Sequence, residues 1–306
     1  MMYRRLTATV AAGGALLLAL TGCLGDGGEK ATGQRPEGAD GADKIPAAQY
    51  MAQVSKKTEQ TDTYSMRMVT SGEMTEQGQT VKAESEARVQ VRLRPEPAMK
   101  GTIVIRGTGP GMGGVGSSAS ADKPVEMIMI GGTIYMKMDL PQGAAGGKPW
   151  LRFSTGESMA EALTQSEQYS PSRMAQMLTT APDVRRAGEE TVEGVRTTRY
   201  SGTVDANTGL NVLDPKDRRA MEKQLQELGA RAMIVDLWVD DQGLPRKQHV
   251  KLDMKQGRLE MTAHFSDYGE PVQISAPPAD QVGDFDEIFK GLEDIVNGAK
   301  PPTAGS

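Results

Sequence analysis

The sequence has 306 residues with 35 Lys and Arg against 40 Asp and Glu, so its formal net charge of −5 makes it a poor candidate for binding nucleic acid. Its single cysteine excludes disulfides within the chain, so burial of a core must stabilise the fold. Aromatic residues make up only 4% of the sequence, whereas methionine occurs 19 times; its flexible thioether suits irregular cores or surfaces that accept variable ligands.

The N-terminus has the pattern of a secretory signal that ends in a lipobox. Arginines at positions 4 and 5 precede an apolar stretch over residues 6–20, and the run Leu20-Thr21-Gly22-Cys23 follows. The stretch is shorter than the roughly 20 apolar residues of a membrane-spanning helix. The pattern resembles bacterial lipoprotein precursors, in which the cysteine is acylated and becomes the mature N-terminus. We therefore expect residues 1–22 to be a signal peptide and Cys23 to anchor the protein at the extracytoplasmic face of the cell membrane.

Composition predicts how the rest of the chain is organised. Residues 24–44 contain mainly glycine, alanine and charged residues, which bury too little apolar surface to fold. We expect a disordered tether over residues 23–45, a single folded domain over 46–297 and a disordered tail over 298–306. No later segment approaches 18 consecutive apolar residues, so the anchor is the expected membrane attachment.

Hydrophobic periodicity predicts the elements of the domain. In chain order they are a helix from Ile45-Pro46 to Thr58; strands over 64–69, 89–93 and 99–106; a Gly/Ser loop over 107–122; a hairpin over 125–138; a strand over 150–153; helices over 158–168 and 171–179; strands over 184–187 and 195–204; a helix from Asp214-Pro215 to Gly229; strands over 233–239, 244–254 and 259–265; and a helix over 285–295. About ten strands and four or five helices indicate an α+β fold, with one large antiparallel sheet and helices on one face.

The clearest hairpin has Gly131-Gly132 as its two-residue turn. The turn predicts a register that sets Glu126 opposite Lys137, a favourable cross-strand charge pair. The other face of the hairpin is then an apolar, methionine-rich surface. We expect its side chains to contact a ligand: Val125, Met127, Met129, Ile134, Met136 and Met138.

The sequence offers little for catalysis. It has no Gly-x-Ser-x-Gly, no P-loop and no His-Glu-x-x-His motif, and its one thiol is assigned to the lipid anchor. Paired carboxylates among 40 acidic residues are more simply explained as solvated surface groups. We expect no enzymatic activity, no cofactor and no metal.

The two histidines need separate consideration. If Gln256-Gly257 forms a symmetric turn, His249 and His264 face each other and are close enough to share a transition metal. The same register would set Asp253 opposite Glu260. We favour two exposed surface histidines, because a metal site needs three or four ligands.

Three segments resemble a known family: Gly194–Gly202, Trp238–Lys247 and Phe265–Ile274. They are similar to the LppX/LprG group of actinobacterial lipoproteins, whose fold is similar to that of the lipoprotein carrier LolA. The resemblance spans most of residues 46–275, and the loop at 107–122 departs from it. It implies a curved antiparallel half-barrel, with helices packed on the concave face around an apolar cavity that holds acyl chains. Members of the group are implicated in carrying or presenting cell-envelope lipids.

The leading hypothesis is therefore a membrane-anchored protein that binds a lipid or other amphiphile in an apolar cavity. The alternative is an interaction or sensor lipoprotein of the envelope, which has a protein partner and no lipid ligand. A hydrolase ranks last, since no nucleophile and base are apparent.

Overall fold

The computed structural model describes residues 45–76, 79–108, 123–137, 147–154, 170–206 and 208–285. All described residues belong to one compact unit, which lies within Glu37–Ser306. Several predicted features lie outside the described residues: the signal peptide, Cys23, the tether up to residue 44, the Gly/Ser loop from residue 109 on, Met138, the helix over 158–168, the C-terminal helix beyond Phe285 and the tail.

The described residues form one sheet of 12 strands, in the order β12-β6-β5-β4-β3-β2-β1-β11-β10-β9-β8-β7. All neighbouring strands are antiparallel except β12 and β6. The strands are β1 (Thr63–Glu76), β2 (Gln79–Arg92), β3 (Ala98–Thr108), β4 (Val125–Ile130), β5 (Thr133–Lys137), β6 (Trp150–Ser154), β7 (Arg185–Val192), β8 (Val195–Asp205), β9 (Ala232–Asp240), β10 (Pro245–Met254), β11 (Gly257–Ser266) and β12 (Val282–Asp284).

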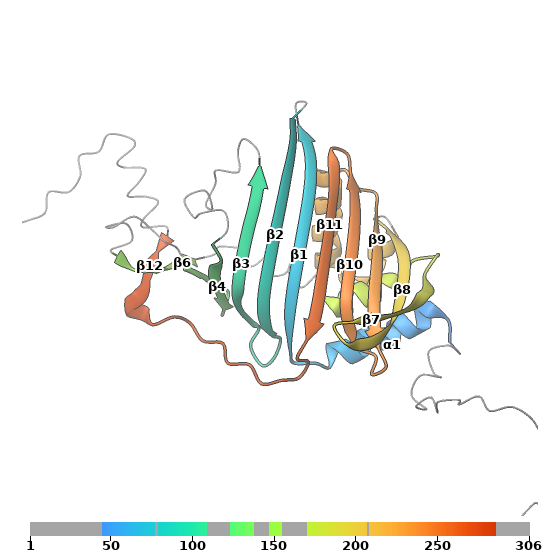
Figure 1. Ribbon diagram of the computed structural model, residues 1–306, viewed down its shortest axis with the longest axis horizontal. Coiled ribbons are helices and arrows are strands. Elements are labelled where there is room, and N and C mark those ends of the chain that lie inside the picture. Colours follow the sequence, from blue (N-terminus) through green and yellow to red (C-terminus); the bar gives the residue numbers. More distant parts are fainter. Residues whose placement is uncertain are drawn as a thin grey trace, which may run out of the picture. The chain divides into compact units, whose positions relative to one another are not determined.

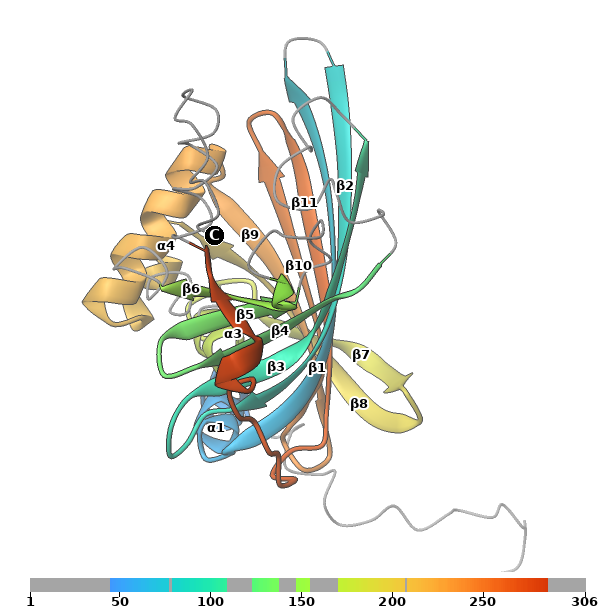
Figure 2. The same cartoon turned by 90° about the vertical axis from the view of Figure 1, so that its left-hand side faces the viewer.

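Among the described residues, three α-helices lie on one face of this sheet: α1 (Ala47–Glu59), α3 (Pro171–Leu178) and α4 (Pro215–Leu228). Short 3-10 turns occupy Gly209–Val212 and Ala279–Gln281. Figure 1 looks onto the outer face of the sheet, with α1 and α4 behind it. Figure 2 shows the curvature, with the helices on the concave side and β4, β5 and β6 bending round toward them. The predicted α+β fold, a curved antiparallel sheet with helices on its concave face, is confirmed.

Local sequence signals explain where the helices begin and end. The Asp214 side chain accepts hydrogen bonds from the backbone N–H of Lys216 and Asp217, both at 3.1 Å, and caps α4. Gly229 ends this helix in the left-handed conformation, with φ 66°. Both ends are as predicted. In α1, Pro46 occupies the N-cap position just before the first turn.

The predicted register of the β4–β5 hairpin is confirmed. Met127 pairs with Met136, and Met129 pairs with Ile134. On the opposite face Glu126 pairs with Lys137, whose Nζ lies 2.7 Å from Glu126 Oε1. The turn glycines have φ values of 59° and 71°, which suit the type I′ geometry of a tight hairpin.

The predicted register of β10 and β11 is wrong. The actual partners of the residues concerned are His249 with Thr262, His264 with Lys247, Lys251 with Glu260, and Asp253 with Arg258. The two histidines are therefore not cross-strand partners.

Gly257 explains the error. It pairs with Met254, so the turn consists of Lys255 and Gln256. A Cβ at Gly257 would lie 1.8 Å from the backbone oxygen of Glu73 in β1. The glycine therefore allows close approach of a third strand, which local turn rules do not reveal.

The main core lies where the helices cover β8, β9 and β10. Its fully buried side chains come from both layers: Met51, Met174, Met177, Leu178, Tyr200, Val204, Leu210, Met221, Val235 and Leu237. A smaller cluster joins β1, β2 and β11 through Tyr64, Val89, Val91, Ala263 and Phe265.

Candidate ligand-binding cavity

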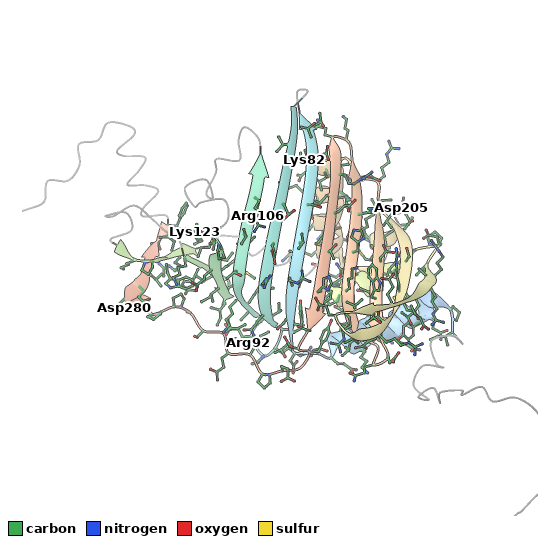
Figure 3. All side chains as sticks on the ribbon, viewed as in Figure 1. Lys82, Arg92, Arg106, Lys123, Asp205 and Asp280 are labelled. Atoms are coloured by element: carbon green, nitrogen blue, oxygen red, sulfur yellow. The ribbon has the colours of Figure 1, made fainter. Side chains whose placement is uncertain are left out.

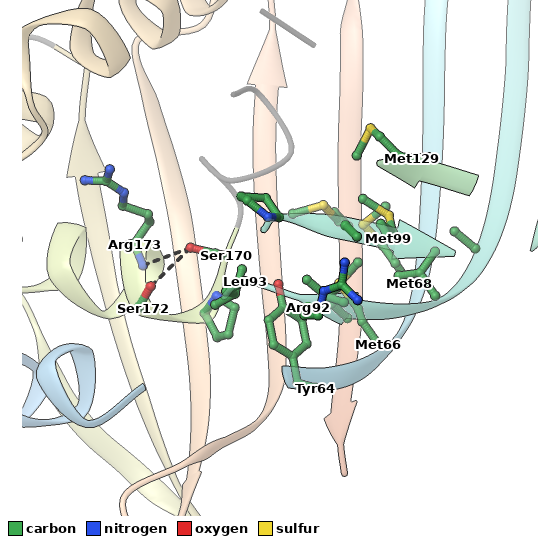
Figure 4. A pocket seen from close by; sticks show the side chains of 18 of the residues that line it. Tyr64, Met66, Met68, Arg92, Leu93, Met99, Met129, Ser170, Ser172 and Arg173 are labelled. Atoms are coloured by element: carbon green, nitrogen blue, oxygen red, sulfur yellow. Dashed lines mark hydrogen bonds between the residues drawn. The ribbon is translucent and has the colours of Figure 1, made fainter. Parts of the chain in front are cut away.

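The part of the concave face formed by β1, β2, β3, β4 and β11 is not filled by side chains of the residues that the structure describes. A cavity of about 1020 Å³ lies there, bounded also by β9, β10 and α4. This volume is at the upper end of the roughly 300–1,000 Å³ of typical small-molecule sites. Figure 4 shows it from close by.

Strand alternation directs the lining side chains inward. Along β1 the even-numbered residues from Tyr64 to Thr70 line the cavity, while their odd-numbered neighbours do not. Pairing carries the row across the sheet, since Met99 of β3 lies between Val91 of β2 and Met129 of β4. The inward face is therefore continuous over several strands.

Most of the lining is apolar, and seven of its residues are methionines: Met66, Met68, Met99, Met127, Met129, Met233 and Met261. Val89, Val250, Leu252 and Leu259 add branched aliphatic surface. Thioether side chains have three rotatable bonds and repack easily around ligands of irregular shape. The wall is therefore apolar and adaptable.

Charged lining residues lie at the ends of elements. We call Glu59, Arg92, Arg94 and Glu96 the rim; they belong to the end of α1 and to the β2–β3 connection. Arg94 Nη1 donates to the backbone oxygen of Glu59 at 3.0 Å, and Arg92 Nε donates to that of Glu96 at 3.1 Å. These bonds tie the end of the helix to the turn that borders the cavity.

A second polar group of the lining lies at the start of α3. The Ser170 hydroxyl caps this helix by accepting from Arg173 N at 3.4 Å (Figure 4). Arg173 Nη2 lies 2.7 Å from Asp217 Oδ2 and 3.3 Å from Asp214 Oδ2. Burial raises the pKa of Asp217, whereas hydrogen bonds from backbone and side chain lower that of Asp214.

The structure brings together some of the predicted ligand-binding residues. Met127 and Met129 line the cavity. Ile134 and Met136 pair with them on the same face, and Val125 follows the same alternation, but these three are not among the lining residues. Met138 lies outside the described residues. A ligand-binding role for this set stays a prediction.

Sequence reasoning missed most of the wall, which β1, β2 and β11 supply. The sequence alternation did predict the strands that contain these lining residues: Met66, Met68, Val89 and Met261. Nothing local indicated that β1 and β11 are neighbours, because almost the whole domain separates them in sequence.

The outer face carries many charged side chains, with ion pairs that cross between strands. Lys82 lies 3.5 Å from Glu73, and Arg106 lies 3.6 Å from Glu84 (Figure 3).

His249 lies on this outer face, with Nδ1 3.8 Å from Asp236 Oδ2 and Nε2 3.7 Å from Glu260 Oε2. Burial acts to raise the pKa of Asp236, but hydrogen bonds from His249, Ser201 and Arg199 outweigh it and hold that pKa at about 2.

His264 lies beside a different carboxylate, with Nδ1 3.2 Å from Glu193 Oε1. Burial, helped by Arg67 and Lys247, lowers its pKa against the opposing effect of Glu193. Within the described ranges, no group of three or more His, Cys, Asp and Glu side chains is placed to hold a metal ion.

Fold and cavity together define a class of protein, in which an open antiparallel sheet carries helices over an apolar hollow. The model of the LppX_LprAFG lipoprotein family matches residues 46–274, so the chain belongs to this family. The match runs from the residue before α1 to beyond the end of β11.

Two Streptomyces proteins are similar to this chain in sequence. A 31.2 kDa Streptomyces griseus protein encoded between rplA and rplJ is 32% identical over 207 residues, which cover 63% of this chain and 67% of the relative. A Streptomyces coelicolor protein whose name proposes a lipoprotein is 33% identical over 151 residues, 47% of this chain and 45% of the relative.

Among solved structures, LprF from Mycobacterium bovis is similar at 18% identity and a TM-score of 0.45, over 76% of this chain and 97% of LprF. The family assignment rests on the family model and the sequence relatives. In the part of the chain that the structure describes, no helix is both long and apolar enough to cross a bilayer.

Proposed function

We propose that this protein binds a lipid or other amphiphile in its cavity, for carriage or presentation at the cell envelope. Residues 1–22 would be a signal peptide, and acylated Cys23 would hold the protein at the extracytoplasmic face of the membrane. A tether over 23–45 would link the anchor to the folded domain at 46–297, and residues 298–306 would form a tail.

The cavity is the observation that carries this proposal. Sheet positions give it a wall of methionine, valine and leucine side chains, and the charged groups among the described lining residues lie at its margins. Such a space suits a molecule with a long apolar part and a polar end.

Burial energies are large enough for binding of this kind. Each methylene removed from water contributes about 0.8 kcal/mol, so one palmitoyl chain contributes roughly 11 kcal/mol. Association costs about 4–15 kcal/mol in lost translational and rotational freedom. For a ligand that enters from water, a single chain therefore roughly offsets the cost of association, and a second chain would supply net affinity.

The mechanism would be passive, with no bond made or broken. The paired strands hold one wall in place, and the methionine side chains adjust to the chain that enters. A tethered domain of this kind would take its ligand from the nearby membrane.

The test is native mass spectrometry of the chain from residue 24 on, which has neither signal peptide nor acylation site. The described sheet and helices use only residues 45–285, so this chain keeps the whole described fold. We expect a lipid that co-purifies at one per protein and leaves the protein on organic extraction.

Protein without any bound lipid, which also fails to take up lipid from vesicles, would contradict the proposal. A stoichiometric protein partner under the same conditions would favour the alternative, an interaction or sensor lipoprotein.

A further inference from the structure

The sheet ends in a strand whose outward edge is open. β7 is the last strand of the order, and β8 is its strand partner among the described residues. Seven of its eight residues are exposed. Figure 2 shows β7 and β8 projecting away from the side of the sheet that carries the helices. An open edge of this kind presents backbone N–H and C=O groups that can pair with another chain.

The charges of β7 follow a self-complementary order. Two arginines, two small residues and two glutamates follow one another in the run Arg185-Arg186-Ala187-Gly188-Glu189-Glu190. Two copies of this run can lie antiparallel about a two-fold axis between positions 187 and 188. Arg185 of one copy then faces Glu190 of the other, and Arg186 faces Glu189. Opposite charges directly across an antiparallel pair are favourable, so this register matches the strand with itself.

A β-bulge in β7 places these charges on matching faces. The register against β8 shifts between Arg186 and Gly188, so Ala187 is an extra residue. Without it, Arg186 and Glu189 would point to opposite faces, because they are three positions apart. In the structure Arg186 Nη2 lies 2.6 Å from Glu189 Oε1, so the two side chains share a face. Facing residues of an antiparallel pair must share a face, and the bulge meets this condition.

The charges of β7 also decide which partner is acceptable. Charged side chains on an edge strand usually prevent pairing with other chains. An identical strand escapes this repulsion, since each of its charges meets an opposite one. Within the chain Glu189 already pairs with Arg186 and Arg196, both at 2.6 Å. These side chains are partly exposed, so exchanging one partner for its counterpart on a second copy costs little.

We propose that this protein forms a two-fold dimer in which β7 of one copy pairs with β7 of a second copy, so that two sheets continue into one. The proposal does not depend on lipid binding, because no residue of β7 or β8 is among the described residues that line the cavity. Chains held at one membrane surface by the anchor proposed above would have a raised local concentration, which favours even a weak dimer.

Charge reversal tests the pairing, measured by analytical ultracentrifugation of the chain from residue 24 on. The wild type should form dimers as its concentration rises from micromolar to millimolar. Arg186→Glu and Glu189→Arg should each sediment as monomers, because like charges then face each other. An equimolar mixture of the two variants should form dimers again, because together they restore opposite charges. Lys82→Glu reverses a charge on β2 and should dimerise as the wild type does.

A wild type that stays monomeric throughout this range would overturn the proposal. A mixture of the two variants that stays monomeric, with both variants folded by circular dichroism, would overturn it as well. Dimers that form equally well in wild type, Arg186→Glu and Glu189→Arg would show that another surface is the interface.

A disulfide tests the register even where a charge reversal disturbs the fold. The chain from residue 24 on contains no cysteine. Ala187→Cys places one thiol beside the two-fold axis, where two copies bring their Cα atoms within the separation that a disulfide spans. Under mild oxidation this variant should give covalent dimer in at least tenfold higher yield than Ser71→Cys, which lies at an exposed position of β1. Equal yields from the two variants would contradict the proposed register.

Discussion

The concave face of this sheet has two halves in which methionine has different surroundings. The covered half packs against the helices, and the hollow half lines the cavity. Under the helices, Met174, Met177 and Met221 are completely buried in the core. In the hollow half, Met66 and Met68 are only half-buried, although they project from the same face. The two groups of methionines differ in burial because helices cover the first group and the cavity borders the second. Methionine content therefore does not distinguish a core from a binding wall, whereas the positions of the helices do.

The largest expected effect is loss of packing in the covered half. Met174→Ala should lower the free energy of unfolding by about 3 kcal/mol, because a completely buried side chain leaves an unfilled space. Urea denaturation measures it. A loss below about 1 kcal/mol would mean that the covered half is not tightly packed, and the comparison would fail.

The second largest effect should be a loss of stability in acid, through Asp236 on the outer face of the covered half. Asp236 has a pKa of about 2, below the roughly 3.9 of an unfolded aspartate. A depressed pKa contributes stability above about pH 4, and this contribution is lost as the pH falls through 2. The contribution is about 2–3 kcal/mol.

The measurement is unfolding free energy between pH 5 and pH 2. Asp236→Asn should flatten this part of the curve relative to the wild type, whereas Asp253→Asn, at an exposed pair with Arg258, should not. Parallel curves for wild type and Asp236→Asn would show that Asp236 is not the acid-sensitive group. Lipid binding at pH 7 should be unchanged in both variants.

A smaller effect should follow from weakening α4, which borders both halves through Leu225. Asp214→Ala removes the N-cap and should destabilise the protein by about 1 kcal/mol. Asp214→Ser restores an acceptor and should recover most of the loss. If both variants are equally destabilised, interaction with Arg173 is the main role of Asp214.

The smallest effect on stability is expected in the hollow half. Met66→Ala should change the unfolding free energy by less than about 1 kcal/mol, because the side chain already borders empty space. The same variant should bind a lipid with a longer acyl chain more tightly than the wild type does, as measured by competition. A loss as large as that of Met174→Ala would erase the distinction between the two halves.

How much could be predicted from the sequence depended on the range of the interaction. The ends of α4 and the register of β4 and β5 depend on residues within a few positions, and both were predicted correctly. The β10–β11 register failed because Gly257 serves contact with a distant strand. Strand β12 was missed for the same reason, since its three residues are held by β6 more than a hundred positions away.

The cavity could be predicted only in part. Two of its methionines came from the hairpin, whose face local pairing determines. The remaining wall forms only because β11 pairs with β1. These strands lie far apart in the sequence, with the helices α3 and α4 between them. The predicted acyl-chain contacts at Val125, Ile134 and Met136 were placed on the correct face but beyond the hollow.

Photo-crosslinking tests the central claim, that the hollow half binds lipid, most directly. A lipid with a diazirine in one acyl chain would be bound to the protein and irradiated, and the labelled residues would be located by peptide mapping. The label should attach to cavity-lining positions of β1, β2 and β11, such as Met66, Val89 and Met261. Ala87→Trp, which places a large side chain inside the cavity from β2, should reduce the yield at least tenfold. Labelling confined to the outer face, or no labelling above a detergent background, would contradict the account.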